Sequence, residues 1–177
     1  ISTIRQQYNV ITLKHINNTR TLQRINFSKF QQIMNITFLT VGKTDDAYLK
    51  DGIEKYVKRL KHYTKLSIVD IDELKNTKAL TQEQQKSREA ELILKKITPQ
   101  DHVILLDEKG MELTSEKFAA YIDKKAIASV SNMVFVGGGP YGFDQSVYNR
   151  ANDKLSLAAM TFSHPIVRLF FIGQLYR

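Results

Sequence analysis

VFVGGGPYGF, residues 134–143, places three consecutive glycines directly after an apolar run typical of a buried β-strand. Gly137, Gly139 and Gly142 match the G-x-G-x-x-G pattern of dinucleotide-binding sites. That pattern belongs in the first strand-to-helix turn of a domain and needs an acidic residue ~20 positions later. Here the region around residue 160 reads LAAMTF, and Pro140 stands where the helix would begin. The glycines therefore predict close approach of some other ligand to the backbone.

Apolar strands alternate with helices on both sides of this stretch. Such alternation predicts a parallel sheet with helices on both faces, and therefore a single α/β domain. Runs rich in β-branched residues predict strands at 35–41, 65–71, 102–106 and 132–136, with a short fifth strand near 155–157. Apolar residues at helical spacing predict helices at 49–60, 90–97, 115–126, 144–151 (with Asp144 as its N-cap) and from Pro165 onward.

The composition narrows the possible functions. The 177 residues suffice for one domain with its own core. The lack of cysteine excludes disulfides and thiolate metal ligands. The four histidines show no spacing typical of zinc sites, so we predict no metal. No apolar run approaches the ~20 residues of a membrane span, and we predict a cytoplasmic protein.

Residues 1–33 differ in character from the rest of the chain. They hold five of the 26 basic residues and no acidic residue, which leaves 21 basic against 18 acidic residues in 34–177. Most of the net charge of +8 therefore comes from this leader, and a body at +3 suits an RNA partner. The leader is either upstream sequence before a start at Met34 or an organellar transit peptide. In both cases we predict that it is dispensable and that the domain is 34–177.

The segment LSLAAMTFSHPIVRLFFIGQLYR, residues 155–177, combines a second ligand-type loop with a very apolar helix. The loop has small residues beside Met160 and Phe162. The helix opens at His164-Pro165 and carries apolar residues on nearly every side. A helix of this kind must be buried all round. We therefore predict a subunit interface that includes Phe170, Phe171 and Leu175.

Four blocks in order resemble one family. They are VGK after the first strand, LLDEKG after the third, GGPYG after the fourth, and the segment 155–177. Together, from Met34 to Arg177, they are similar to the bacterial 23S rRNA (pseudouridine-N3)-methyltransferases of the SPOUT superfamily. The resemblance implies a C-terminal segment threaded into a trefoil knot and a homodimer that binds S-adenosylmethionine in the knot. It also implies methyl transfer to N3 of a pseudouridine in 23S rRNA of the ribosome.

The resemblance also implies which residues bind the cofactor. The backbone at a glycine would approach the cofactor closely, while apolar side chains would sandwich the adenine and main-chain groups of the loop would bind its edge. Carried over by position, these residues are Leu106, Gly138, Leu157, Ala158, Ala159, Met160, Thr161 and Phe162.

The sequence departs from the family pattern in three places. A bulky aliphatic residue is usual at Gly137, and a glutamate is usual at Gly173. The pattern also continues past Tyr-Arg into a Pro-Tyr-His-basic tail, whereas this sequence stops at Arg177. The tail would hold substrate-side residues, so we expect cofactor binding with poor methyl transfer. The alternative is a catalytically impaired SPOUT-fold protein, or a fragment, that binds RNA or the ribosome.

Candidates for the substrate side remain within the chain. They are Arg168, Tyr176 and Arg177, and the residue that accepts the proton is left unassigned. For Arg168, a salt bridge across the dimer is an equally good interpretation. For His164, hydrogen bonding at the start of a helix is favoured over a role as a base.

Overall fold

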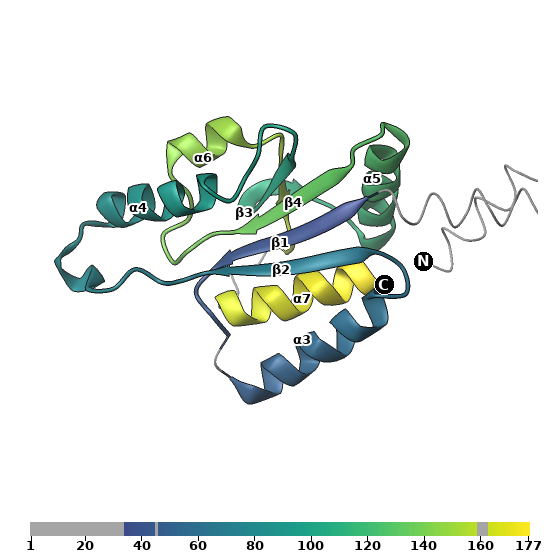
Figure 1. Ribbon diagram of the computed structural model, residues 1–177, viewed down its shortest axis with the longest axis horizontal. Coiled ribbons are helices and arrows are strands. Elements are labelled where there is room, and N and C mark those ends of the chain that lie inside the picture. Colours follow the sequence, from purple (N-terminus) through teal and green to yellow (C-terminus); the bar gives the residue numbers. More distant parts are fainter. Residues whose placement is uncertain (1–33, 45, 159–162) are drawn as a thin grey trace, which may run out of the picture.

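The computed structural model describes residues 34–44, 46–158 and 163–177 (Figure 1). Its centre is a five-stranded sheet in the order β2-β1-β4-β3-β5, and all four strand pairs are parallel. The predicted parallel α/β fold is thus confirmed. The strands are β1 Asn35–Val41, β2 Lys65–Ile71, β3 His102–Glu112, β4 Asn132–Gly137 and β5 Asp153–Ser156.

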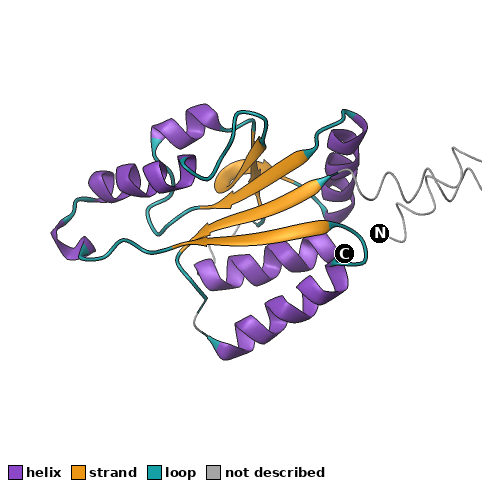
Figure 2. Ribbon diagram, in the orientation of Figure 1, coloured by secondary structure: helices purple, strands orange, loops and turns teal. Residues whose placement is uncertain are grey.

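Helices cover both faces of the sheet (Figures 1 and 2). One face carries α4 and α6, whose apolar residues join a core cluster with Leu39, Val103 and Val136. The opposite face carries α3, α5 and α7 over a second cluster that includes Phe38 and Phe135. The helices are α3 Ala47–Leu60, α4 Gln82–Leu94, α5 Ser115–Ile127, α6 Gln145–Arg150 and α7 His164–Tyr176, with a short 3-10 turn η1 at Thr77–Ala79.

Phe171 of α7 is the centre of the second cluster. Its ring centroid lies 4.5 Å from that of Phe38 and 4.7 Å from that of Phe135, and the residue is fully buried. Burial of such a ring stabilises the fold by about 1.5–3 kcal/mol. The prediction that Phe171 belongs to a subunit interface is therefore wrong, because this chain's own sheet covers it.

Helix α7 is not buried on every side within one chain. Phe170 is 37% exposed and Ile166 is 41% exposed, although both are apolar. We predicted that α7 would be buried on every side, but one chain buries only the face toward α3 and the sheet. Phe170 and Ile166 are the large apolar residues of α7 that stay exposed to solvent in a single chain, and the subunit interface stays a prediction.

Several element boundaries differ from those predicted. Helix α4 begins at Gln82, well before 90, because Thr81 and Gln84 form a capping box at its start. Strand β5 begins and ends earlier than 155–157, and β3 extends past 106 through an irregular register between Leu106 and Met111. The N-cap Asp144 is confirmed, since its carboxylate accepts a hydrogen bond from the Ser146 backbone N–H at 2.9 Å.

Two predictions concern residues outside the described ranges. The leader 1–33 is one of them. The trefoil knot is the other, because residues 159–162 lie between β5 and α7. Both stay predictions. Among the described residues, no helix combines the length and the apolar character that crossing a membrane would require.

Candidate functional site

Three neighbouring strands, β3, β4 and β5, bring the predicted cofactor residues together where the ladder between β3 and β4 ends. Leu106 pairs with Gly137 of β4 on one side and with Leu155 of β5 on the other. Gly138 and Leu157 directly follow these strands, so their positions lie at the same edge, where ligands of open α/β sheets bind. Ala158 lies there too, while Ala159, Met160, Thr161 and Phe162 are outside the described residues.

The glycine-rich loop after β4 closes in a tight turn. The Gly142 N–H donates to the Gly139 carbonyl at 3.0 Å, and Gly142 has a φ of +77° that favours glycine. A side chain on Gly138 would meet the Phe143 ring, whose nearest carbon lies 3.1 Å from the position of a Cβ. Gly138 therefore makes room for the protein's own aromatic ring, a packing role that the sequence did not predict.

Apolar surface remains partly uncovered at these strand ends. Leu106 and Leu157 both pack against the second core cluster yet are only partly buried. The buried Ser156 hydroxyl donates to the Ala158 carbonyl at 2.9 Å, which fixes the start of the loop after β5. Partly exposed apolar side chains beside main-chain groups fit an adenine ring, which needs flat apolar contacts and donors or acceptors at its edge.

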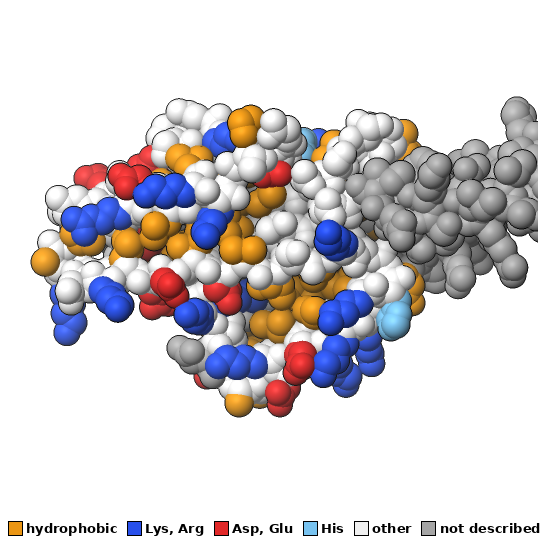
Figure 3. All heavy atoms as spheres, viewed as in Figure 1, with side chains coloured by type: hydrophobic (Ala, Val, Ile, Leu, Met, Phe, Trp, Pro, Cys, Tyr) orange, Lys and Arg blue, Asp and Glu red, His pale blue; other side chains and the backbone are white. Residues whose placement is uncertain are grey.

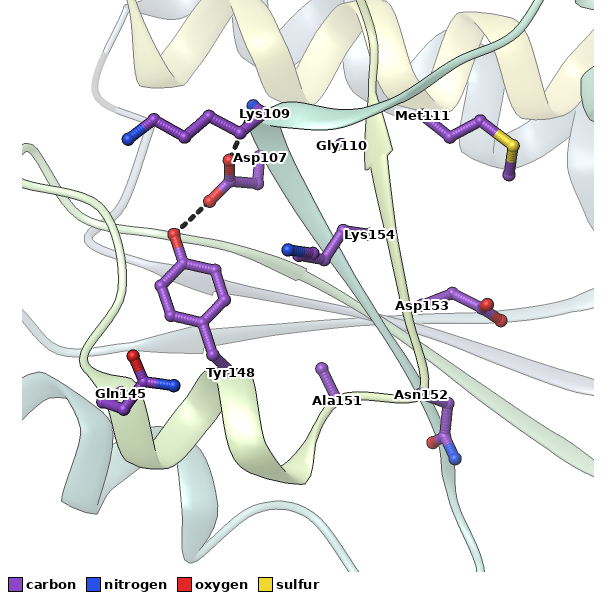
Figure 4. Close-up of a pocket in the computed structure, with 10 residues that line it drawn as sticks. All are labelled: Asp107, Lys109, Gly110, Met111, Gln145, Tyr148, Ala151, Asn152, Asp153 and Lys154. Atoms are coloured by element: carbon purple, nitrogen blue, oxygen red, sulfur yellow. Dashed lines mark hydrogen bonds between the residues drawn. The ribbon is translucent and has the colours of Figure 1, made fainter.

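A polar pocket of about 630 Å³ opens beside Leu106 (Figure 4). In it the Tyr148 hydroxyl of α6 donates to the Asp107 carboxylate of β3. Sequence reasoning missed this pair, although the position of Asp107 directly after an apolar strand was a usable signal. The pocket is lined by Asp107, Lys109, Gly110, Met111, Gln145, Tyr148, Ala151, Asn152, Asp153 and Lys154.

A buried carboxylate lies against the glycine loop. Glu89 of α4 is 4% exposed and accepts a hydrogen bond from the Gln85 side chain at 2.8 Å. Burial raises the pKa of Glu89, the Gln85 hydrogen bond opposes that shift, and the charge of Glu73 adds to it. A side chain on Gly139 would overlap the Glu89 carboxylate. Sequence reasoning missed Glu89 too, because it lies in the polar stretch SREAEL.

Arg168 is held inside the subunit. It is 5% exposed, and its guanidinium donates to the Val41 carbonyl at 2.9 Å, to the Gly42 carbonyl and to the Thr44 hydroxyl at 3.0 Å. One guanidinium nitrogen also lies 3.4 Å from the Asp70 carboxylate. Arg168 therefore holds the beginning of α7 against the carboxyl end of β1. This contact within one chain differs from the two predicted roles, a substrate contact and a salt bridge across the dimer.

His164 stands at the start of α7, near Arg168. His164 is exposed, but the protein around it still withdraws the imidazole in part from water. This desolvation and the charge of Arg168 lower the pKa of His164, and the charge of Glu73 opposes the shift. The neutral imidazole is thus favoured at this position. That state can accept a proton or a hydrogen bond at one ring nitrogen.

Tyr176 and Arg177 lie at the other edge of the sheet. The Tyr176 ring packs against Tyr56 of α3 and Tyr63, with centroids 5.7 and 6.3 Å away, and Arg59 lies over it. Tyr63 precedes β2, so this aromatic group is at the amino ends of the strands. Within one chain, the structure does not bring Tyr176 and Arg177 together with Leu106 and Gly138.

Across the described part of the chain, His, Asp and Glu side chains form no group of three or more that could hold a metal ion. Polar groups near the predicted cofactor residues include Asp107 with its partner Tyr148, Ser156, and Glu89 beside Gly139.

Comparisons with known proteins show the family of the chain. A family model described as "Predicted SPOUT methyltransferase" matches residues 34–177. A "Ribosomal RNA large subunit methyltransferase H" from Parabacteroides distasonis is 48% identical over 144 residues, which are 81% of this chain and 92% of the relative. Proteins of the same name from Cytophaga hutchinsonii and Flavobacterium psychrophilum are both 50% identical with the same coverage. The chain therefore belongs to the SPOUT methyltransferase family.

Proposed function

We propose that this chain transfers a methyl group from S-adenosylmethionine to N3 of a pseudouridine in 23S rRNA. One observation carries the proposal: β3, β4 and β5 gather Leu106, Gly138 and Leu157 where the ladder between β3 and β4 ends. The names of the similar proteins support a large-subunit rRNA substrate. A ribosomal substrate also supports a cytoplasmic location.

The chain's own residues bind and orient the cofactor, which supplies an activated methyl group on its sulfonium. Leu106 and Leu157 pack against the adenine, and the backbone at Gly138 approaches the adenosine. The loop 157–162 contributes main-chain donors and acceptors. Orientation matters because attack must be in line with the breaking S–CH₃ bond, and alignment alone supplies much of such a rate enhancement.

On the substrate side, the ring nitrogen must lose its proton as the new N–CH₃ bond forms. A base that is unstacked from a ribosomal stem-loop can reach the cofactor site at the ends of the strands. The residue that accepts the proton stays unassigned. Arg168 contributes indirectly in this proposal, because its contacts with Val41 and Gly42 hold α7 against the strand ends.

A second copy of the chain completes the site. Tyr176 and Arg177 lie at the amino ends of the strands in their own chain, so they can contact substrate only at a partner's pocket. Ile166 and Phe170 give α7 an exposed apolar surface for that interface. Two-fold pairing is the commonest way to cover such a surface.

The interface is tested with neighbouring residues of α7. Phe170→Asp is expected to give folded monomers, because Phe170 is partly exposed, whereas Phe171→Asp is expected to unfold the chain. Light scattering gives the mass, and circular dichroism reports folding. If the Phe170→Asp variant is a folded dimer, the interface lies elsewhere.

The activity is tested by two assays on the chain. Calorimetry should detect binding of S-adenosylmethionine and none of NAD. Transfer of labelled methyl to ribosomes that lack the modification, compared with free transfer RNA, identifies the substrate. Cofactor binding without transfer to either RNA would favour the catalytically impaired alternative, and tight binding of NAD alone would refute the methyltransferase proposal.

A further inference from the structure

The pocket beside Leu106 holds an arrangement that the proposed chemistry has not used. Both carboxylate oxygens of Asp107 are engaged: one accepts from the Lys109 backbone N–H at 2.7 Å, and the other accepts from the Tyr148 hydroxyl (Figure 4). Asp107 comes from β3 and Tyr148 from α6. The hydrogen bond between them therefore joins two segments that the sheet ladder does not hold together.

The hydrogen bond between Asp107 and Tyr148 lies just beyond the point where β3 and β4 stop pairing. The ladder between β3 and β4 ends at the pair Leu106 and Gly137. Beyond this pair β4 ends and Gly138 begins the glycine loop, whereas β3 continues through Asp107 to Glu112 without pairing with β4. Strand pairing therefore does not set the distance between Asp107 and the glycine loop.

A continuous line of contacts connects them. The Tyr148 ring packs edge-on against the Phe143 ring, with centroids 5.8 Å apart at 78°. Phe143 is 7% exposed, and its nearest ring carbon lies 3.1 Å from the position that a Cβ on Gly138 would take. The contacts thus run from Asp107 through Tyr148 and Phe143 to the backbone of Gly138.

The hydrogen bond has a fixed direction at neutral pH. Burial raises the pKa of Tyr148 well above its ordinary value, and the hydrogen bond and charge of Asp107 raise it further. Tyr148 therefore stays a donor. Lys154 lies over its ring, with Nζ 5.5 Å from the centroid, and adds a cation–π contact that restricts the ring.

We propose that Asp107 and Tyr148 are positioning residues that fix the distance between β3 after Leu106 and the glycine loop after β4, and with it the affinity for S-adenosylmethionine. The inference rests on the proposed function, since it assumes that the cofactor binds between Leu106 and Gly138. Neither side chain is assigned a chemical step.

The test measures cofactor affinity after removal of the hydrogen bond alone. Tyr148→Phe keeps the ring against Phe143 and deletes only the hydroxyl, and Asp107→Asn weakens the acceptor. Each single variant is expected to bind S-adenosylmethionine and S-adenosylhomocysteine about tenfold more weakly in calorimetry. The double variant is expected to be no weaker than the worse single variant, because both substitutions remove the same interaction.

Tyr121→Phe is the matched control. It also deletes a tyrosine hydroxyl that donates to an aspartate, here Asp153 at 2.7 Å, but on the face covered by α5. A merely structural role predicts that both phenylalanine variants lower the melting temperature and leave cofactor affinity alone. Our proposal predicts a loss of affinity for Tyr148→Phe only.

The possible outcomes separate the two claims. If the unaltered chain binds S-adenosylmethionine and the Tyr148→Phe variant binds it equally well, the positioning role is wrong and the proposed function stands. Additive losses in the double variant, or an equal loss of affinity in the Tyr121→Phe variant, would also overturn the positioning role. If the unaltered chain binds neither cofactor, both proposals fall.

Discussion

Asp153 is partly buried and Glu89 is buried, and the fold shifts the pKa values of these two carboxylates in opposite directions. At the start of β5, one oxygen of Asp153 lies 2.7 Å from each of three donor groups, on His102, Tyr121 and Lys125. Burial acts to raise the pKa of Asp153, but these hydrogen bonds outweigh it and lower the pKa. Glu89 has a single hydrogen bond, from Gln85, and burial raises its pKa.

The two carboxylates lie at opposite ends of the strands, and this position matches the difference in their hydrogen bonds and pKa shifts. The Asp153 carboxylate joins the starts of β3 and β5 to α5 and serves stability. The residue also lines the pocket beside Leu106, but its three partners lie outside that lining. Glu89 lies at the carboxyl edge, against the glycine loop. A carboxylate whose pKa is raised by burial beside a ligand loop is typical of functional sites, where stability is given up for chemistry or fit.

Removal of Asp153 should produce the largest effect. We expect Asp153→Ala to lower the free energy of unfolding by about 2–3 kcal/mol, because Lys125 and Tyr121 lose their shared partner in a partly buried place. Urea denaturation at pH 7 measures this loss. Cofactor affinity is expected to stay unchanged, and a parallel loss of affinity would contradict the separation of the two regions.

The pH dependence sharpens this test. Because the pKa of Asp153 is lowered in the fold, its contribution is present above the ordinary value of 3.8 and is lost as the pH falls through the folded value. The unaltered chain and the Asp153→Ala variant should thus converge in acid. Asp72→Ala is the control, since the ion pair of Asp72 with Lys43 is exposed on both sides and its loss should cause no measurable change at pH 7.

Crowding the Glu89 carboxylate should have an intermediate effect. Gly139→Ala places a methyl group where that carboxylate lies, and we expect a loss of about 1–2 kcal/mol in the free energy of unfolding. In a Glu89→Ala background the same substitution should cost less than half as much. An unchanged cost would mean that the two residues are not coupled.

Neutralising Glu89 should give the smallest effect, and one of opposite sign. We expect Glu89→Gln to raise the free energy of unfolding at pH 7 by on the order of 1 kcal/mol, since an uncharged amide avoids the penalty for burying charge. The pKa of Glu89 is raised in the fold, so this gain should vanish as the pH falls below the ordinary value of 4.5. A destabilised variant at pH 7 would show that the charge itself is needed.

The fold was largely predictable because its local patterns are strong. The runs at 35–41 and 65–71 match β1 and β2 at both ends, and Asp144 caps α6 as its residue type predicts. The first half of α4 was missed because it has few apolar residues, although Thr81 and Gln84 were a readable capping signal. Phe170 and Phe171 look alike in sequence, and only packing separates the exposed ring from the buried one.

The site was less predictable than the fold, because its parts depend on contacts between distant segments. The family resemblance supplied Leu106, Gly138 and Leu157, but their position at one edge follows from the strand order, which the sequence did not predict. The pairing of Asp107 with Tyr148 links β3 to α6, and Glu89 meets Gly139 across a similar gap in sequence. A sequence shows the residues of such pairs, but it does not show that they are in contact in the folded chain. The contacts of Arg168 with the end of β1 were unpredictable for the same reason.

Helix α7 is a rod of 13 residues, about 18 Å long at the usual rise per residue, with its two ends at opposite edges of the sheet. If the end at Tyr176 serves a neighbour's pocket, each working pocket is built from two chains, and defects in the two parts can complement one another. A chain disabled at Gly138 and a chain disabled at Tyr176 would each be inactive alone. Mixed freely, roughly half of the dimers would be hybrids with one complete pocket in two, so about a quarter of the pockets would recover.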